Sequence, residues 1–214
     1  FPAPAENITE NGWKTVIDLN LNGTWNVIKA VQSTHSPTNG PLSIVNVTAD
    51  VRNGKLFMAH TAAARAGVEN LAKTLSQEWG NQGIRVNCVA PGTILGNGMN
   101  NYSDEIRRQT VETHYMNPLG RLGTEAEISA AIVFLLSPAS SYITGTTLQV
   151  TGGAHLRKGM EDSFIPYSDD YVIPAEFGFD TITRGITGQP GYFQNPIPSG
   201  FEGLVDKYTK KAKL

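Results

Sequence analysis

Two short stretches decide how this sequence folds: Leu42-Ser43-Ile44-Val45-Asn46-Val47 and Ile84-Arg85-Val86-Asn87-Cys88-Val89. Each is an apolar run rich in β-branched residues and bounded by turn residues, which is the pattern of a buried strand. Between them, a helix is predicted from about Thr61 to Trp79, and its first turns are unusually rich in Ala and Gly. A strand, a helix and a second strand in this order predict a parallel βαβ unit.

Further elements flank this unit on both sides. Upstream, apolar residues recur at three- and four-residue steps, which predicts a long helix from Thr9 to Val31. Downstream, residues 97–101 are predicted to be a mobile loop and residues 104–116 a charged helix. Thr124-Glu125-Ala126-Glu127 then has the form of a capping box, which opens an apolar helix to Leu136. Thr147-Leu148-Gln149-Val150 has the pattern of a third strand.

Strands that alternate with helices of this length predict a parallel sheet with helices on both faces. Only three strands are recognisable, whereas a doubly wound sheet normally has more. The predicted fold class is therefore α/β, the C-terminal half of a Rossmann-like doubly wound parallel sheet. From Ala154 the pattern gives way to Pro, Gly and aromatic residues without a period, which predicts an extended arm. We expect a domain over residues 1–155 and a tail over residues 156–214.

The composition argues against several classes of function. The 214 residues carry 17 Lys and Arg against 19 Asp and Glu, a net charge of −2, and a nucleic-acid partner usually requires a basic excess. No apolar run reaches the roughly 18 residues of a membrane span. The single cysteine, Cys88, cannot form an internal disulfide and is expected to be a buried, inert thiol. The four histidines show no metal-ligand spacing, so no metal is expected.

Several motifs together resemble the catalytic half of the short-chain dehydrogenase/reductase family. The match covers about residues 5 to 155. The matching segments are Asp18-Leu19-Asn20-Leu21-Asn22-Gly23, Asn46-Val47-Thr48, Arg85-Val86-Asn87-Cys88-Val89-Ala90-Pro91-Gly92, Leu135-Leu136-Ser137-Pro138, Tyr142-Ile143-Thr144-Gly145 and Val150-Thr151-Gly152-Gly153.

The catalytic positions depart from the usual pattern of that family. The family's active-site asparagine falls on Asn20 and its serine on Thr48, but its tyrosine falls on Thr61 and its lysine on Arg65. A threonine hydroxyl is far less acidic than a phenol, so Thr61 cannot serve as a general acid near neutral pH. Arg65 stays protonated, although it can donate to ribose hydroxyls and supply a fixed positive charge.

A reaction that needs no tyrosine acid fits this site. When a carbon–carbon double bond conjugated to a thioester is reduced, hydride goes to the β-carbon and negative charge builds on the thioester oxygen. The site then needs donors aimed at an oxyanion rather than a strong acid. Thr48, Thr61 and Asn20 are the expected donors, and Arg65 reinforces the field. His60 is either a proton donor or a structural histidine.

The string Ala59-His60-Thr61-Ala62-Ala63-Ala64-Arg65-Ala66-Gly67-Val68 is similar to members that reduce acyl-CoA and lack the tyrosine. It is most similar to those acting on trans-2-enoyl-CoA in peroxisomes, and next to those acting on 2,4-dienoyl-CoA. The dienoyl enzymes typically have Asp-Gly-Gly where this chain has Thr151-Gly152-Gly153. A third alternative is a catalytically silent member that binds acyl-CoA or a partner subunit.

The resemblance also implies a cofactor, NADPH. The family's glycine-rich pyrophosphate loop is absent from this sequence and would precede it, so we expect the chain to be the C-terminal part of a longer enzyme and inactive alone. Arg65 would contact the cofactor, and Pro91, Gly92 and Ile94 are the matched positions that would border its nicotinamide. The stretch 93–123 matches the family's substrate-covering loop.

The tail carries a candidate address. The last residues, Ala212-Lys213-Leu214, resemble the peroxisomal targeting tripeptide that an import receptor reads at a free C-terminus. A short helix over residues 201–208 would hold this tripeptide in solvent. The predicted localisation is peroxisomal, and the predicted partners are an acyl-CoA substrate, the import receptor and further copies of the chain in a homo-oligomer.

Overall fold

A computed structural model describes residues 1–96, 98, 102–104, 106–107, 118–119 and 121–156. The chain divides into two compact units. The first comprises Phe1–Gly92 and Ala131–Thr151, and the second the described residues of Thr93–Ala130 and Gly152–Leu214. Most of the predicted loop 97–101 and helix 104–116, the tail from residue 157 and its predicted helix 201–208 lie outside the described residues.

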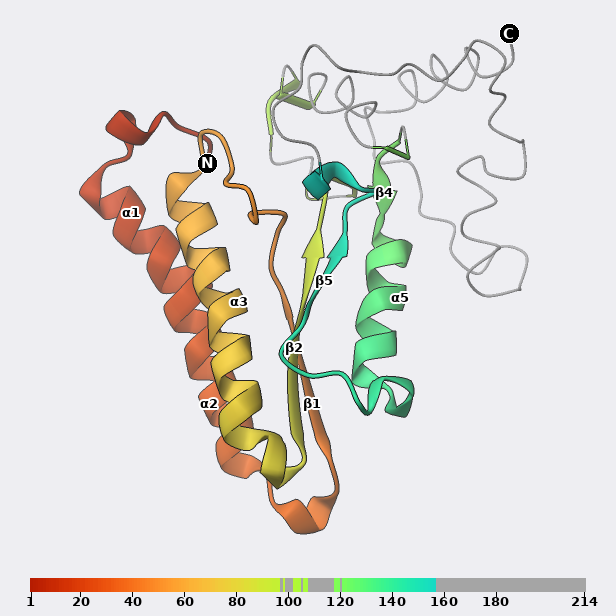
Figure 1. The fold of residues 1–214 in the computed structure, drawn as a ribbon. Helices are drawn as coiled ribbons and strands as arrows, with labels where there is room; N and C mark the ends of the chain where they lie inside the picture. The colour runs from red at the N-terminus through yellow and green to blue at the C-terminus, as the bar shows by residue number, and fades with distance from the viewer. Residues whose placement is uncertain (97, 99–101, 105, 108–117, 120, 157–214) are drawn as a thin grey trace, which may run out of the picture. The chain divides into compact units, whose positions relative to one another are not determined.

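The first unit is built on a parallel sheet of three strands, β1 (Leu42–Val47), β2 (Ile84–Pro91) and β5 (Thr147–Val150), in the order β1-β2-β5 (Figure 1). Leu42 pairs with Ile84, and Cys88 pairs with Thr147. All three strands were predicted, and β2 runs to Pro91 rather than ending at Val89. The fold is α/β, and its sheet corresponds to the C-terminal half of a Rossmann-like doubly wound sheet.

The long N-terminal helix is confirmed, but it contains an irregular turn. The side chain of Thr9 caps it by accepting a hydrogen bond from the backbone N–H of Gly12, at 3.0 Å. α1 (Glu10–Ile17) then leads into a π-helical turn, Asp18–Asn22, which continues as α2 (Gly23–Thr34). A π turn inserts one extra residue into a helix and occurs frequently at functional sites.

α3 (Ala59–Trp79) connects β1 to β2 and covers one face of the sheet (Figure 1). β2 is the central strand, and its alternate residues face opposite sides because successive side chains of a strand alternate. Those on the α3 side form a core with residues of α2 and α3. The buried members of this core are Ile28, Val68, Ala72, Leu75, Trp79, Ile84, Val86 and Cys88.

The intervening residues of β2 are polar and hold the opposite side of the first unit. The guanidinium of Arg85 donates to the backbone oxygens of Leu135, Ser137 and Ile143, at 3.0–3.2 Å. The Asn87 side chain donates to Ile143 O at 2.9 Å and accepts from the Thr146 N–H at 3.1 Å. These bonds fasten the end of the last helix and the loop before β5 to the central strand.

The second unit contains a two-stranded parallel ladder, β3 (Ile94–Leu95) with β4 (Gly123–Thr124). α5 (Glu125–Leu136) begins in this unit and continues in the first. A 3₁₀ turn, Ala154–Leu156, is the last described element. The ladder was not predicted, because two-residue strands carry no periodic signal.

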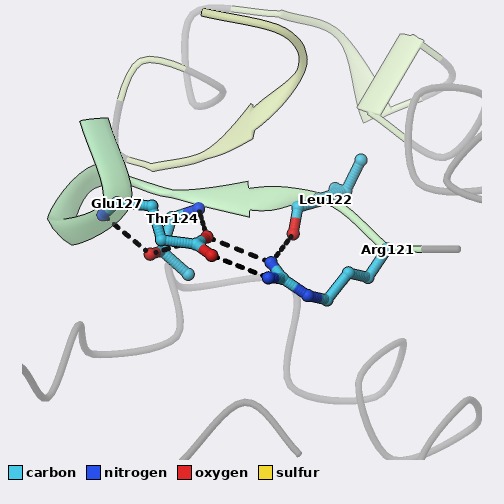
Figure 2. A network of polar contacts seen from close by, with 4 residues as sticks. All are labelled: Arg121, Leu122, Thr124 and Glu127. Carbon is cyan, nitrogen blue, oxygen red and sulfur yellow. Dashed lines mark hydrogen bonds and ion pairs between the residues drawn. The ribbon is translucent and has the colours of Figure 1, made fainter. Parts of the chain in front are cut away.

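The predicted capping box is present at the start of α5 (Figure 2). The Glu127 carboxylate accepts from the Thr124 N–H at 2.9 Å, and the Glu127 N–H donates to Thr124 Oγ1 at 3.3 Å. Arg121 adds a bidentate ion pair to Glu127, at 2.7 and 3.0 Å. Burial alone would raise the pKa of Glu127, but the hydrogen bonds and charge of Arg121, with the bonds from Thr124, lower it below its usual range.

Candidate active site

Thr48 follows β1 directly and lies against the end of β2. Its side chain is 5% exposed. Its backbone N–H donates to Val89 O at 2.8 Å, and the next ladder-like bond runs from Asp50 N–H to Pro91 O at 3.0 Å. The hydroxyl donates to the Glu69 carboxylate, with Oγ1 and Oε1 3.0 Å apart, and lies 3.3 Å from Val89 O. The structure therefore places Thr48 at the carboxyl ends of two adjacent strands, which is where open α/β sheets bind ligands.

Glu69 is the residue that the sequence analysis missed. It lies one helical turn after Arg65, and spacing of four residues puts Thr61, Arg65 and Glu69 on one side of α3. That spacing is the signal that could have drawn attention to it, since two of the three positions match the family's catalytic motif.

Arg65 joins α3 to the end of β1. Its Nη1 donates to Val47 O at 2.5 Å. Its Nε is buried and has no hydrogen-bond partner among the described residues. Burial lowers the pKa of this guanidinium from its ordinary value of 12.5, yet an arginine remains charged at neutral pH. A buried, charged N–H without a partner is costly, and it is the kind of donor that a bound ligand satisfies.

Thr61 is half-buried in the first turn of α3 and is paired with His60. The backbone N–H of Thr61 donates to His60 Nδ1 at 2.8 Å, and its hydroxyl lies 3.3 Å from the same nitrogen. His60 is fully buried, and Phe1 packs edge-to-face on its ring with centroids 4.6 Å apart. Because Nδ1 accepts a hydrogen bond, it carries no proton to give, and Nε2 has no partner among the described residues.

Asn20 lies in the π turn. Its side-chain amide donates to Val16 O at 2.9 Å, and its backbone oxygen accepts from the Thr24 hydroxyl at 2.7 Å. An amide group has two hydrogens, so one remains for a ligand. The turn packs against α3 at Gly67, where a Cβ would lie 3.1 Å from the Leu21 side chain. The small residues of α3 thus allow the close approach of this helix.

The expected cofactor positions fall in both units. Pro91 ends β2, and Gly92 donates its N–H to Val150 O at 3.0 Å. A Cβ at Gly92 would lie 2.8 Å from Thr151 Cα, so a side chain there would collide with backbone. Ile94 begins β3 in the second unit. All of the predicted site residues except Ile94 lie in the first unit. Thr48, Pro91 and Gly92 lie at the carboxyl ends of β1 and β2, where Arg65 contacts Val47 O. Thr61 and the half-buried Asn20 have only local hydrogen-bond partners among the described residues.

None of the described helices is both long and apolar enough to cross a membrane. No group of three or more His, Cys, Asp or Glu side chains among the described residues is arranged to hold a metal ion.

The pKa of the buried Cys88 thiol is raised to about 12, first by burial and then by the charge of Glu69. This thiol is therefore protonated and unsuited to nucleophilic chemistry.

Comparison with known families identifies the class. The family model described as Enoyl-(Acyl carrier protein) reductase matches residues 1–155. The chain therefore belongs to this family of short-chain dehydrogenases/reductases, as its motifs predicted.

The individual relatives that the chain resembles include 2,4-dienoyl-CoA reductases. It is 37% identical over 156 residues to the mouse peroxisomal 2,4-dienoyl-CoA reductase [(3E)-enoyl-CoA-producing], which covers 72% of the chain and 53% of the relative. It is 41% identical over 158 residues to a Bacillus subtilis protein described as a 2,4-dienoyl-CoA reductase, covering 73% and 62%. The chain therefore spans about half to three-fifths of the length of these relatives.

Among solved structures, the citronellol catabolism dehydrogenase AtuB of Pseudomonas aeruginosa is 40% identical, with a TM-score of 0.60 over 72% of this chain and 59% of that one. A protein from Agrobacterium tumefaciens described as a 2-deoxy-D-gluconate 3-dehydrogenase, with bound NADP, is 32% identical, with a TM-score of 0.65 over 73% and 64%.

Proposed function

We propose that the full-length protein uses NADPH to reduce the carbon–carbon double bond of a trans-2-enoyl-CoA. The observation that carries this proposal is the site itself. Thr61 stands where the family has its phenolic acid, one helical turn before the half-buried Arg65, whose buried Nε has no partner among the described residues. Such a site offers positive charge and hydrogen-bond donors but no strong acid, which suits an oxyanion. The curated names of the mouse and Bacillus relatives support an acyl-CoA substrate.

Each residue of the site has a separate role in that reaction. When bound, NADPH would supply the hydride that adds to the β-carbon, and a proton added afterwards at the α-carbon completes the reduction. Arg65 provides a fixed positive charge near the thioester oxygen on which negative charge builds. Asn20 donates its second amide hydrogen, and the Thr61 hydroxyl rotates from His60 Nδ1 to donate as well, since hydroxyl hydrogens reorient readily. Thr48 lines the same site.

The residues present fit a nicotinamide cofactor. The buried Nε of Arg65 lacks a partner that a ribose hydroxyl would supply. The end of β2 at Pro91 and Gly92, with Ile94 beyond it, provides the matched positions for the nicotinamide. The Agrobacterium relative carries bound NADP, which supports NADPH rather than NADH.

An assay of the full-length protein tests this function. We expect NADPH oxidation on addition of trans-2-hexenoyl-CoA, and Thr48→Ala and Arg65→Ala should each lower the rate. Absence of turnover, with NADPH and acyl-CoA still bound, would favour a catalytically silent binding protein instead.

A second candidate substrate is a 2,4-dienoyl-CoA, which the names of the mouse and Bacillus relatives favour. Thr151 stands where the dienoyl enzymes typically have aspartate, and this favours the simple enoyl substrate. The ratio of kcat/KM for 2,4-hexadienoyl-CoA and trans-2-hexenoyl-CoA decides between them.

We propose that the protein is peroxisomal. The tripeptide Ala212-Lys213-Leu214, which lies outside the described residues, supports this proposal, as does the peroxisomal name of the mouse relative. Deleting the tripeptide should move a tagged full-length protein to the cytosol without changing its activity. Unchanged import would remove the proposal.

We also propose a homo-oligomer. Several apolar side chains of α1, the π turn and α2 are exposed in the first unit, and a second copy would cover them. They are Trp13, Leu19, Trp25, Val27 and Val31. Light scattering of the full-length protein tests this, and a monomeric mass would refute it.

A further inference from the structure

The hydroxyl of Thr48 has a fixed direction. A carboxylate can only accept hydrogen bonds, so in the 3.0 Å contact with Glu69 Oε1 the hydroxyl must donate. The other near acceptor, Val89 O at 3.3 Å, can only accept as well. A hydroxyl has one hydrogen, and both of these acceptors compete for it. What remains for a ligand is the pair of lone pairs on Thr48 Oγ1, so Thr48 meets a ligand as a hydrogen-bond acceptor.

The charge of Glu69 is held toward the sheet rather than in solvent. Its carboxylate contacts Thr48, which is 5% exposed, and its negative charge is felt by Cys88 on β2. The two acceptors of the hydroxyl therefore come from two elements packed against Thr48, Glu69 from α3 and Val89 from β2. This arrangement fixes the position of Oγ1 as well as its polarity.

A hydrogen-bond acceptor at this position favours a ligand group that carries an N–H or O–H donor. The reacting end of an enoyl thioester contains a double bond, a carbonyl and a sulfur atom, and none of them carries an N–H or O–H donor. The carboxamide of a nicotinamide ring does carry an NH₂ group. Thr48 is hydrogen-bonded to Val89 near the end of β2, and the next backbone bond, two residues further on, joins Asp50 to Pro91. Pro91 and Gly92 are the proposed neighbours of the nicotinamide ring.

We propose that Glu69 is a positioning residue that makes Thr48 the hydrogen-bond acceptor for the carboxamide NH₂ of the nicotinamide. This inference rests on the proposed function in one respect, the use of a nicotinamide cofactor. It assigns to Glu69 a role that acts through Thr48, and it assigns to Thr48 a contact with cofactor rather than with the thioester.

A cofactor analogue tests the contact without turnover. In 3-acetylpyridine adenine dinucleotide phosphate a methyl group replaces the carboxamide NH₂, so the donor is lost while the rest of the cofactor is kept. We expect the full-length wild-type protein to bind NADP⁺ about tenfold more tightly than this analogue, as measured by titration calorimetry, because one hydrogen bond is lost.

Four variants separate the roles of the two residues. Thr48→Val keeps the shape and removes the acceptor, so the preference for NADP⁺ should fall towards one. Glu69→Met keeps the bulk and removes the carboxylate, and it should reduce the preference similarly, with no further fall in the double variant. Glu69→Gln retains an acceptor oxygen and should restore the preference. Glu78→Gln, an exposed glutamate on the same helix, is the matched control.

Each result decides one point. An unchanged preference in Thr48→Val overturns the acceptor role, and Thr48→Ala answers the same question if the valine variant does not fold. A reduced preference in Thr48→Val but not in Glu69→Met overturns the role of Glu69. Absence of NADP⁺ binding by the wild type overturns both this inference and the proposed function. Discrimination between the two cofactors without turnover of either acyl-CoA removes only the proposed function.

Discussion

Two arginines in the first unit lie on opposite sides of the sheet and differ in the hydrogen bonding of their guanidinium groups. Arg85, on β2, donates to three backbone oxygens at the end of α5 and in the following loop. Arg65, on α3, donates to Val47 O, and its buried Nε has no hydrogen-bond partner among the described residues. Both donate to backbone carbonyl groups, but in the described part of the chain only Arg65 keeps a buried N–H without a partner.

The difference teaches how to separate a structural cation from a functional one. Folding alone favours a fully paired guanidinium, because each buried N–H left unpaired costs free energy. An arginine that keeps an unpaired, buried N–H at the carboxyl end of a sheet is satisfied by something that binds there. We therefore expect Arg85 to stabilise the fold and Arg65 to contact a ligand.

The largest expected effect tests Arg65. Arg65→Met should lower kcat for trans-2-hexenoyl-CoA about a hundredfold, because the fixed positive charge near a developing oxyanion is lost. The free energy of unfolding, measured by urea titration of the full-length protein, should change little. Arg65→Lys, which keeps the charge, is the control and should recover part of the activity. A large loss of stability in Arg65→Met would show that both arginines are structural.

Arg85 should behave in the opposite way. Arg85→Met should lower the free energy of unfolding by about 2 kcal/mol, because the three hydrogen bonds from the guanidinium to the oxygens of Leu135, Ser137 and Ile143 are lost. Below the new unfolding midpoint, kcat should stay near the wild-type value. If kcat falls instead while stability is kept, the division between the two arginines is wrong.

A third arginine, Arg121, extends the comparison through its partner Glu127. Glu127→Gln should cost about 1 kcal/mol at pH 7, because the ion pair and part of the cap are weakened. The pKa of Glu127 is lowered in the folded protein, so this stability is complete above the ordinary value of 4.5 and is lost as the pH falls through the lower folded pKa. The difference in unfolding free energy between wild type and variant should therefore shrink below pH 4.5.

The smallest effect concerns Cys88, on the side of β2 that packs against α3. The Cys88 thiol is buried and its pKa is raised to about 12, so iodoacetamide at pH 8 should label it only after the protein unfolds. Glu69→Gln removes the second cause of that shift but not the larger one, burial, and should leave the native protein unlabelled. Rapid labelling of the native wild type would mean that water reaches this side of the sheet.

The sequence predicted those parts of the fold whose signals are local. β1 and β5 begin and end where their β-branched runs do, and the Thr124–Glu127 capping box forms because both partners lie within one turn. The π turn around Asn20 was not predicted, because one inserted residue hardly disturbs a three- and four-residue pattern of apolar positions.

The candidate site was predicted only where the family motif reached it. Thr48, Thr61 and Arg65 were found by alignment to that motif. Glu69 was missed because its partner, Thr48, lies outside α3, and only folding brings the end of β1 against the third turn of α3. The satisfied state of Arg85 and the unsatisfied state of Arg65 likewise depend on which carbonyl groups surround each side chain.

The strand order also determines how long one edge of β2 stays unpaired during synthesis on the ribosome. β2 is paired with β1 across a single helix, but its other neighbour, β5, is synthesised only after the whole segment from Gly92 to Thr146. Until then, a strand whose core residues are fully buried in the finished protein has an open hydrogen-bonding edge. Such an edge can recruit other unfinished chains, so the nascent protein depends on chaperone protection during that interval.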